Sequence, residues 1–217
     1  MKLAKLSALL LAMAACSSAQ AAGVGIRAGT TGIGADFGWN VAPTLNGRVG
    51  YSAFSYNTHI DTDVRYNTKL KLSNLNAFID WSPFLGTFRF TGGVIANDNR
   101  YDLTGTGSTY TINGRTYQSS DAGSFGGAVK SGRQLAPYLG VGWGNVAGAG
   151  VNFYADLGIM FMGSPKASLS ASCASSLSPG QCAQLQSDVA AERARLEDRL
   201  HRFKYYPVAN IGVTIGF

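Results

Sequence analysis

The last fourteen residues of the chain constrain its fold more than any other stretch. Counted back from the terminus, every second residue is apolar: Phe217, Ile215, Val213 and Ile211. The residues between them are small or polar, so residues 204–217 are predicted to form a strand with one apolar and one polar face. In lipid, the backbone groups of such a strand must all be paired, so the strand has to close a sheet. The alternative is a soluble strand that happens to end the chain.

Residues 1–21 have the order of a secretory signal peptide. Lys2 and Lys5 precede a short apolar segment, and residues 19–21 (Ala-Gln-Ala) supply the small residues of a cleavage site. We expect the mature chain to begin at Ala22. The apolar segment is too short to cross a membrane as a helix.

A competing interpretation takes residues 13–16 as a lipoprotein box, in which Cys16 would be lipidated. Met13 stands where such boxes usually have leucine, so the match is poor. Beyond residue 21 no stretch approaches 18 consecutive apolar residues, and no transmembrane helix is predicted.

The composition fits a membrane barrel better than a soluble domain. The chain has 28 glycines, 10 tyrosines and 11 phenylalanines, and only 14% of its residues are charged. Chains of this kind make weak soluble cores but suit a barrel coated by lipid. Residues 22–217 fit a single domain. The formal net charge of +6 includes Lys2 and Lys5 of the signal segment and is too mild to predict a nucleic-acid partner.

Alternating segments predict an all-β protein, a single antiparallel transmembrane barrel. The phase of alternation changes at Thr31-Gly32, where a tight turn would give two strands and a bulge would give one. It changes again near Ser73-Asn74, where we expect a bulge. With a turn at Thr31-Gly32 the chain has eight strands: residues 23–30, 33–41, 45–57, 66–81, 87–101, 135–143, 151–161 and 204–217.

The lengths of the connections support an even number of strands. Short turns at Pro43, Pro83 and residues 145–150 all fall at one end of an eight-stranded barrel. The longer polar loops, at residues 58–65 and 102–133 and before the last strand, fall at the other end. Short periplasmic turns and long external loops are typical of outer-membrane barrels. Within residues 102–133, Asn113-Gly114 predicts a hairpin with a type I′ turn.

One segment has helical spacing instead. Ser178 and Gln181 form a capping box around Pro179, and apolar residues then recur every three or four positions. We expect one surface helix over residues 181–202, in the last long loop. Because Cys16 leaves with the signal segment, Cys173 and Cys182 remain as an even pair in an oxidising compartment, which predicts a disulfide.

The barrel interior is predicted to hold six charged residues, three of each sign. Since charges rarely enter a half-buried sheet face without partners, we expect a salt-bridge network across the lumen. Eight strands leave an interior that side chains roughly fill. A filled lumen without traffic is the favoured interpretation, and a narrow gated path for water or small ions is the alternative. The six residues are Arg27, Asp36, Arg48, Asp80, Arg89 and Asp156.

All three tryptophans are predicted on the lipid face close to a short turn, at the level of the C-terminus. Such a grouping indicates an aromatic girdle at one membrane interface. The girdle would comprise Trp39, Trp81, Trp143 and Phe217.

The signal segment, the alternation and the ending Ile211–Phe217 together resemble the small bacterial outer-membrane β-barrels of the OmpA, OmpX and OmpW type. This resemblance covers residues 23–217. It implies a location in the Gram-negative outer membrane, contact with outer-membrane lipids and lipopolysaccharide, and transport by periplasmic chaperones. It also implies that the barrel assembly machinery reads Ile211, Val213, Ile215 and Phe217. The implied roles are envelope structure, surface interaction with an unnamed external ligand, or passage of small solutes.

An enzymatic function is not predicted. Some small barrels process lipids with Ser, His and a carboxylate on the wall. Here His59 lies in a predicted polar loop, and His201 shares a helix face with Glu197, a pair that more often forms a surface salt bridge. The sequence indicates no cofactor and no metal site.

Overall fold

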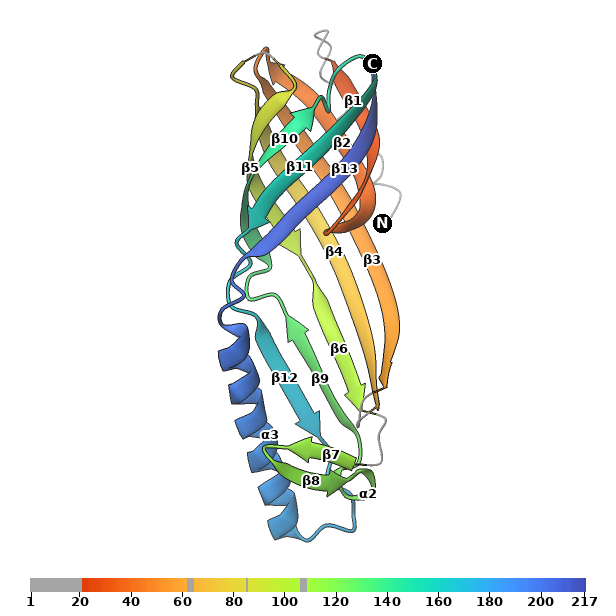
Figure 1. Cartoon of the computed structure of the whole chain (residues 1–217), viewed down its shortest axis with the longest axis vertical. Coiled ribbons are helices and arrows are strands. Elements are labelled where there is room, and N and C mark those ends of the chain that lie inside the picture. The colour runs from red at the N-terminus through yellow and green to blue at the C-terminus, as the bar shows by residue number, and fades with distance from the viewer. Residues whose placement is uncertain (1–20, 62–64, 85, 106–108) are drawn as a thin grey trace, which may run out of the picture.

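The protein folds into a closed antiparallel barrel with an external extension. The computed structural model describes residues 21–61, 65–84, 86–105 and 109–217. Neighbouring strands pair in the order β1-β2-β3-β4-β5-β10-β11-β13, and β13 pairs back to β1 with Gly216 opposite Gly23. The predicted eight-stranded barrel is therefore confirmed (Figure 1). The barrel strands are β1 (Ala22–Gly29), β2 (Gly32–Ala42), β3 (Leu45–Asp61), β4 (Arg65–Trp81), β5 (Phe88–Asn97), β10 (Leu135–Gly144), β11 (Gly150–Met160) and β13 (Tyr206–Gly216).

A tight turn separates the first two strands. Gly29 lies opposite Gly32, so the turn itself consists of Thr30 and Thr31. Gly32 adopts a φ of +107°, which only glycine adopts without strain. Of the two alternatives for residues 23–41, two strands joined by a turn is the correct one.

The short turns lie together at one end of the barrel. They connect β2 to β3 at Pro43, β4 to β5 near Pro83, and β10 to β11 through residues 145–149. The start of β1 and the C-terminal residue meet at the same level, where Ala22 donates to the Phe217 carbonyl at 3.0 Å and accepts from its N–H at 2.9 Å. This arrangement matches the parity predicted from the loop lengths.

At the opposite end the sheet continues outward as an external domain. β3 and β4 run beyond the barrel, and β6 (Arg100–Gly105), β9 (Phe125–Lys130) and β12 (Lys166–Ala171) add to β4 in that order (Figure 1). We call these five strands the external sheet. The hairpin β7 (Thr109–Ile112) and β8 (Arg115–Gln118), the short helix α2 (Ser119–Ala122) and the helix α3 (Pro179–Leu200) complete the external domain.

The local signals in the external domain form as predicted. Asn113 and Gly114 take φ values of +52° and +79° at the tip of the β7–β8 hairpin. Ser178 caps α3 through the predicted capping box with Gln181. The Cys173–Cys182 disulfide is confirmed and ties the segment after β12 to the first turn of α3. In the described part of the chain, no helix combines the length and apolarity needed to cross a membrane.

Three details of the predicted strands are wrong. The pairing of β3 with β4 runs without a register shift from Leu45 opposite Trp81 to Asp61 opposite Arg65, so there is no bulge near Ser73. The same two strands occupy most of the loop expected at residues 58–65. The loop expected at residues 102–133 contains much of β6 and all of β9. Residues 1–20 of the predicted signal segment, residues 1–21, lie outside the described residues.

Candidate functional site

The six charged residues predicted for the lumen all point into it. They come from six different strands, and each is at most 3% exposed. Full desolvation makes an unpaired charge very unfavourable, so their pairing decides whether the barrel is stable. The residues and their strands are Arg27 on β1, Asp36 on β2, Arg48 on β3, Asp80 on β4, Arg89 on β5 and Asp156 on β11.

Four of the six form an alternating ring of charge. Arg48 reaches Asp80 at 3.1 Å and Asp156 at 2.6 Å. Arg89 reaches the same two carboxylates, Asp156 at 2.5 Å and Asp80 at 3.4 Å. Each arginine thus bridges both aspartates, and β3 is tied across the lumen to β11. Thr91 adds a hydrogen bond to Asp80 at 2.6 Å.

The other two charges form a neighbouring pair with polar support. Arg27 contacts Asp36 at 3.2 Å and donates to the Asn76 side-chain oxygen at 2.6 Å. The Tyr154 hydroxyl donates to Asp36. The Tyr154 ring also lies 5.4 Å from the Arg48 guanidinium, within cation–π range. Tyr154 therefore joins the pair to the ring. The six-residue network predicted from the sequence did not include it.

Glycines on the inward face make room for this network. A methyl group at Gly142 would lie within 2.7 Å of both the Asp156 carboxylate and the Arg89 guanidinium. At Gly50 it would collide with the Asp36 carboxylate. The network occupies space that the backbone leaves free by carrying no side chain there.

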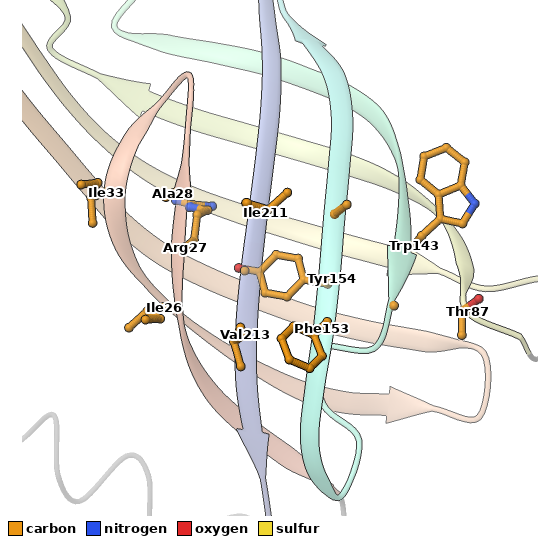
Figure 2. A pocket seen from close by; sticks show the side chains of 13 residues that line it. Ile26, Arg27, Ala28, Ile33, Thr87, Trp143, Phe153, Tyr154, Ile211 and Val213 are labelled. Carbon is orange, nitrogen blue, oxygen red and sulfur yellow. The ribbon is translucent and has the colours of Figure 1, made fainter.

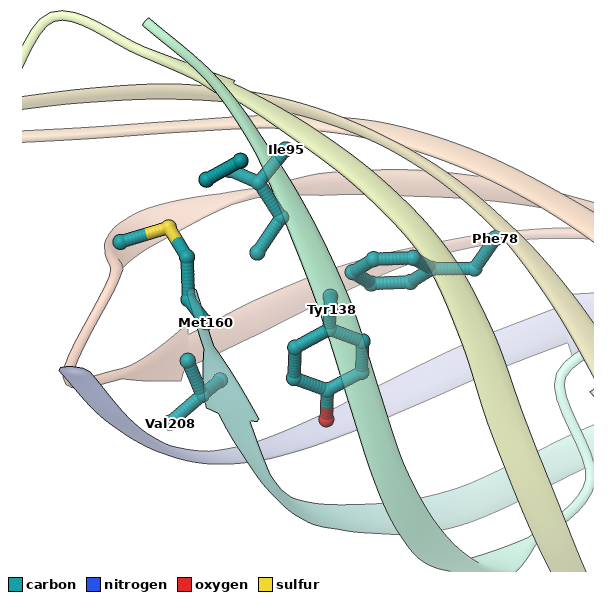
Figure 3. Close-up of a cluster of buried hydrophobic side chains, with 6 residues drawn as sticks. Phe78, Ile95, Tyr138, Met160 and Val208 are labelled. Atoms are coloured by element: carbon teal, nitrogen blue, oxygen red, sulfur yellow. The ribbon is translucent and has the colours of Figure 1, made fainter. Parts of the chain in front are cut away.

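An apolar cluster closes the lumen on the external side of the network. Its members come from β4, β5, β10, β11 and β13 (Figure 3). The Phe78 and Tyr138 rings are stacked, with their centroids 4.6 Å apart. We call this cluster the outer lid. Sequence reasoning missed it, although apolar residues on the inward phase near the outer strand ends were a usable signal. The outer lid consists of Phe78, Ile95, Ala136, Tyr138, Met160 and Val208.

The β10–β11 turn closes the other mouth. Val146 and Ala147 are 1% and 3% exposed although they belong to a turn. The Val146 carbonyl lies against Gly23 on β1 and Gly38 on β2, so the turn folds into the opening. Thr214 of β13 donates to the Asn145 carbonyl at 3.3 Å and holds the turn in place.

The lumen therefore contains three successive filled layers: an inner turn, a charge-balanced network and an outer lid. Among the described residues, no group of His, Cys, Asp and Glu is arranged to hold a metal ion. His201 is exposed, and among the described residues it makes no ion pair with Glu197. The Glu197 carboxylate instead accepts the Ala167 N–H at 3.3 Å. The side chain of His59 lies outside the described set.

The outer wall carries the apolar residues predicted to face lipid. Trp81 and Trp143 are about half exposed and pack on Phe90 and Phe88, whereas Trp39 is partly covered and stacks on Phe37. Among the proposed assembly-signal residues, Ile211, Ile215 and Phe217 are exposed and Val213 is half-buried. A shallow hollow of about 750 Å³ in this wall is lined mainly by residues of β1, β2, β10, β11 and β13 (Figure 2).

The external domain has an apolar core of its own. Leu185 and Val189 of α3 pack against Tyr110 and Ile112 of the hairpin and Ala171 of β12. At 0% exposure, Leu185 and Ile112 are as buried as residues in a soluble protein core. This part of the chain has the usual arrangement, with apolar residues inside and polar residues outside.

Asp188 joins α3 to the hairpin. Its carboxylate accepts from the Tyr117 hydroxyl at 2.5 Å and from the Asn113 amide at 2.9 Å, and Arg115 lies 3.7 Å away. These hydrogen bonds, that of Tyr117 first, hold the pKa of Asp188 below its ordinary value. The burial of Tyr117 and its bond to Asp188 raise the pKa of the tyrosine.

A pocket of about 400 Å³ lies where the external domain meets the barrel. Met162 and Tyr206 line it on the barrel side and also pack against the outer lid. We call this space the vestibule. Its other apolar lining residues are Leu72, Tyr101, Leu103 and Val129 of the external sheet and Leu200 and Phe203 at the end of α3.

Comparisons with known proteins support the fold. No protein-family model matches the sequence, and no curated protein matches it in sequence. The crystal structure of CarO2 from Acinetobacter baumannii matches with a TM-score of 0.60 at 20% identity, over 92% of this chain and 100% of that one. CarO from the same organism matches with a TM-score of 0.59 at 21% identity, over 90% and 97%. The predicted resemblance to small outer-membrane barrels is thus confirmed for the fold.

Proposed function

We propose that the protein is an integral outer-membrane protein whose barrel is a closed anchor and whose external domain is the interacting part. The filled lumen carries this proposal, because a channel needs a continuous polar path and a catalyst needs an accessible reactive group. The ring of Arg48, Arg89, Asp80 and Asp156 is almost fully desolvated and balanced in charge. It stabilises the barrel without leaving a site for an ion.

The distribution of apolar residues supports placement in a membrane. The barrel exposes large apolar side chains around its wall, such as Ile26 at 70%, Leu139 at 61% and Phe153 at 73%. In water such a wall would aggregate, whereas lipid covers it at no penalty. Delivery by a cleaved signal peptide and recognition of the C-terminal strand by the assembly machinery are part of the same proposal.

Planar-bilayer recording tests the closed anchor. The wild-type protein should give no unitary current. Arg89→Ala should also give none, because the outer lid still blocks the lumen on the external side of the space that the arginine side chain leaves. Current through the wild type would overturn the proposal in favour of a narrow channel. Outer-membrane fractionation and a heat-modifiable band on unboiled gels check that the protein used is inserted and folded.

The vestibule favours a second candidate function, the binding of a small apolar ligand at the cell surface. The pocket is large enough for a compact molecule, is lined mainly by apolar side chains, and ends on the outer lid. A fluorescent naphthylamine probe should bind the folded protein, and Leu103→Trp should weaken binding at least fivefold by filling the space. Exposed Leu139→Trp on the wall is the matched control. Equal binding by both variants would exclude the vestibule.

A further inference from the structure

The external sheet carries a row of four cations on neighbouring strands. The strand registers place Lys71 of β4 opposite Arg100 of β6, Arg100 opposite Lys130 of β9, and Lys130 opposite Lys166 of β12. Directly paired residues point to the same face, so the four side chains share one face of the sheet. We call them the cationic row. With neighbouring strands 4.7–4.9 Å apart, the row is about 14 Å long.

This face is the outward continuation of the lipid-facing wall. Along β4, Ile79, Leu75, Ser73 and Lys71 have the same parity, and the pairing with β3 is uninterrupted between them. The apolar wall ends at Leu75, which is 56% exposed. Lys71 lies four residues farther out on the same strand, a distance of about 13 Å along the strand, or roughly 10 Å along the barrel axis for a tilted strand. The cationic row therefore lies just beyond the apolar wall, at headgroup level in the proposed membrane placement.

The row is only partly neutralised within the described part of the chain. Like charges directly opposite destabilise a sheet, and here three consecutive pairs are of like charge. Asp102 contacts Arg100 at 3.1 Å and Lys71 at 3.9 Å. Neither Lys130 nor Lys166 has an ion pair among the described residues. With Lys69, which lies opposite Asp102, and the exposed Asp98, the side chains that the structure describes on this face comprise five cations and two carboxylates.

A hollow adjoins one end of the row. Its volume is about 520 Å³. Lys71 and Arg100 line it on the external side, Tyr51 and Ala53 line it toward the wall, and the acidic Asp98 lines it beside Ser73. The Tyr51 hydroxyl lies 3.1 Å from the Ser73 hydroxyl, which adds a polar edge. From its external side toward the wall, this concave surface thus presents two cations, then hydroxyls with one carboxylate, and then an aromatic side chain.

We infer that this face binds the phosphate groups of lipopolysaccharide in the outer leaflet. Phosphates on the sugar headgroup supply the anions that the cationic row lacks, the sugar occupies the hollow, and the acyl chains lie on the apolar wall below Tyr51. A soluble acidic protein would pair with the cations but would leave the apolar side of the hollow uncovered. The inference rests on the proposed outer-membrane location and extends it by naming the lipid class and the residues that bind it.

Two variants and a matched control test the inference in the full mature protein in detergent. The first variant combines Lys71→Gln, Arg100→Gln, Lys130→Gln and Lys166→Gln. The second, Lys130→Gln with Lys166→Gln, breaks no ion pair of the described chain and so leaves folding unaffected. The control, Arg193→Gln with Arg199→Gln, removes two exposed charges from α3. Binding of bis-phosphorylated lipid A is measured by native mass spectrometry, beside lipid A without phosphates and inorganic phosphate alone.

The fourfold variant should bind bis-phosphorylated lipid A at least tenfold more weakly than wild type, and the twofold variant at least threefold. The control should stay within twofold, and lipid A without phosphates should bind all four proteins equally. Wild-type affinity in the fourfold variant, or equal losses in the control, would overturn the inference. Displacement of the lipid by equimolar inorganic phosphate would also overturn it, by making the free anion the ligand. A retained heat-modifiable band separates lost binding from lost folding, and outer-membrane fractionation of the wild type tests the location independently.

Discussion

The barrel and the external domain share two strands, β3 and β4, but have opposite interiors. Inside the barrel, β4 presents Asn76 and Asp80 among buried charges, and its outer face presents Leu75 and Ile79. Beyond Ser73 the apolar residue, Leu72, lies on the inner side and the charged residue, Lys71, on the outer side. The strand itself does not change, because its pairing with β3 keeps one register throughout.

The difference follows from the solvent on each side. A barrel wall in hydrocarbon must be apolar outside and can keep polar groups inside when they are paired. A sheet in water needs the reverse, and α3 and the hairpin cover part of its apolar face, at β9 and β12. In the proposed membrane placement, the change of phase near Ser73 therefore marks where the chain leaves the lipid. The two regions should fail independently, which the following predictions use.

The largest effect is expected from breaking the charged ring in the barrel. Arg48→Met removes the arginine that bridges Asp80 and Asp156 and leaves both carboxylates short of a partner in a desolvated site. Removing one member of a buried pair costs about 3–5 kcal/mol. Urea unfolding in detergent, followed by loss of the heat-modifiable band, should show this decrease in barrel stability. Exposed Arg193→Met is the control, and an equal decrease in the control would remove the special role of the ring.

A substitution that weakens the core of the external domain should leave the barrel intact. Leu185→Ala opens a cavity in the core between α3 and the hairpin and costs that domain about 2–5 kcal/mol. Limited proteolysis should then cleave the external domain faster, with an unchanged heat-modifiable band. Substitution of the exposed Ser187 by Ala serves as the control. If Leu185→Ala also lowers barrel stability, the two regions form one cooperative unit.

Sequence reasoning found the barrel because its alternation is long and strict. Eight strands, the capped helix, the hairpin at Asn113-Gly114 and the disulfide each depend on a local pattern that one sequence displays. The bulge expected at Ser73-Asn74 was wrong because a change of phase has two physical causes, an extra residue or a change of solvent, and the alternation alone does not separate them.

The external sheet was missed for a different reason. β9 and β12 are six residues each and present glycine, alanine and serine on both faces, so they resemble loops until a partner strand covers them. The six inward charges were predicted individually, but their pairing depends on register across the lumen. That register brings Arg48 to Asp156, 108 positions apart in the chain.

The disulfide should stabilise only the external domain. Cys173 and Cys182 close a loop with a sequence separation of 9, for which chain entropy predicts about 2–3 kcal/mol. Cys173→Ser with Cys182→Ser should therefore speed proteolysis within α3 and β12 by less than Leu185→Ala does. Reduction of the wild type with dithiothreitol should reproduce the effect, while the same reductant should leave the double variant unchanged. Barrel unfolding in urea should be the same for the oxidised wild type, the reduced wild type and the double variant.

The smallest effect is expected from acid at the junction of α3 and the hairpin. The pKa of Asp188 in the folded protein lies below its ordinary value of 3.8, chiefly because Tyr117 and Asn113 donate to the carboxylate. A lowered pKa gives stability that is complete above the unfolded pKa and is lost as pH falls through the folded one, so the hairpin should loosen below about pH 4. NMR of the Asn113 side-chain amide should report the loss, and Asp188→Asn should show no such dependence. Because none of the contacts of Asp188 with the described residues reaches the barrel, the interior of the barrel should not respond to this change of pH. Matching acid transitions in the two regions would contradict their independence.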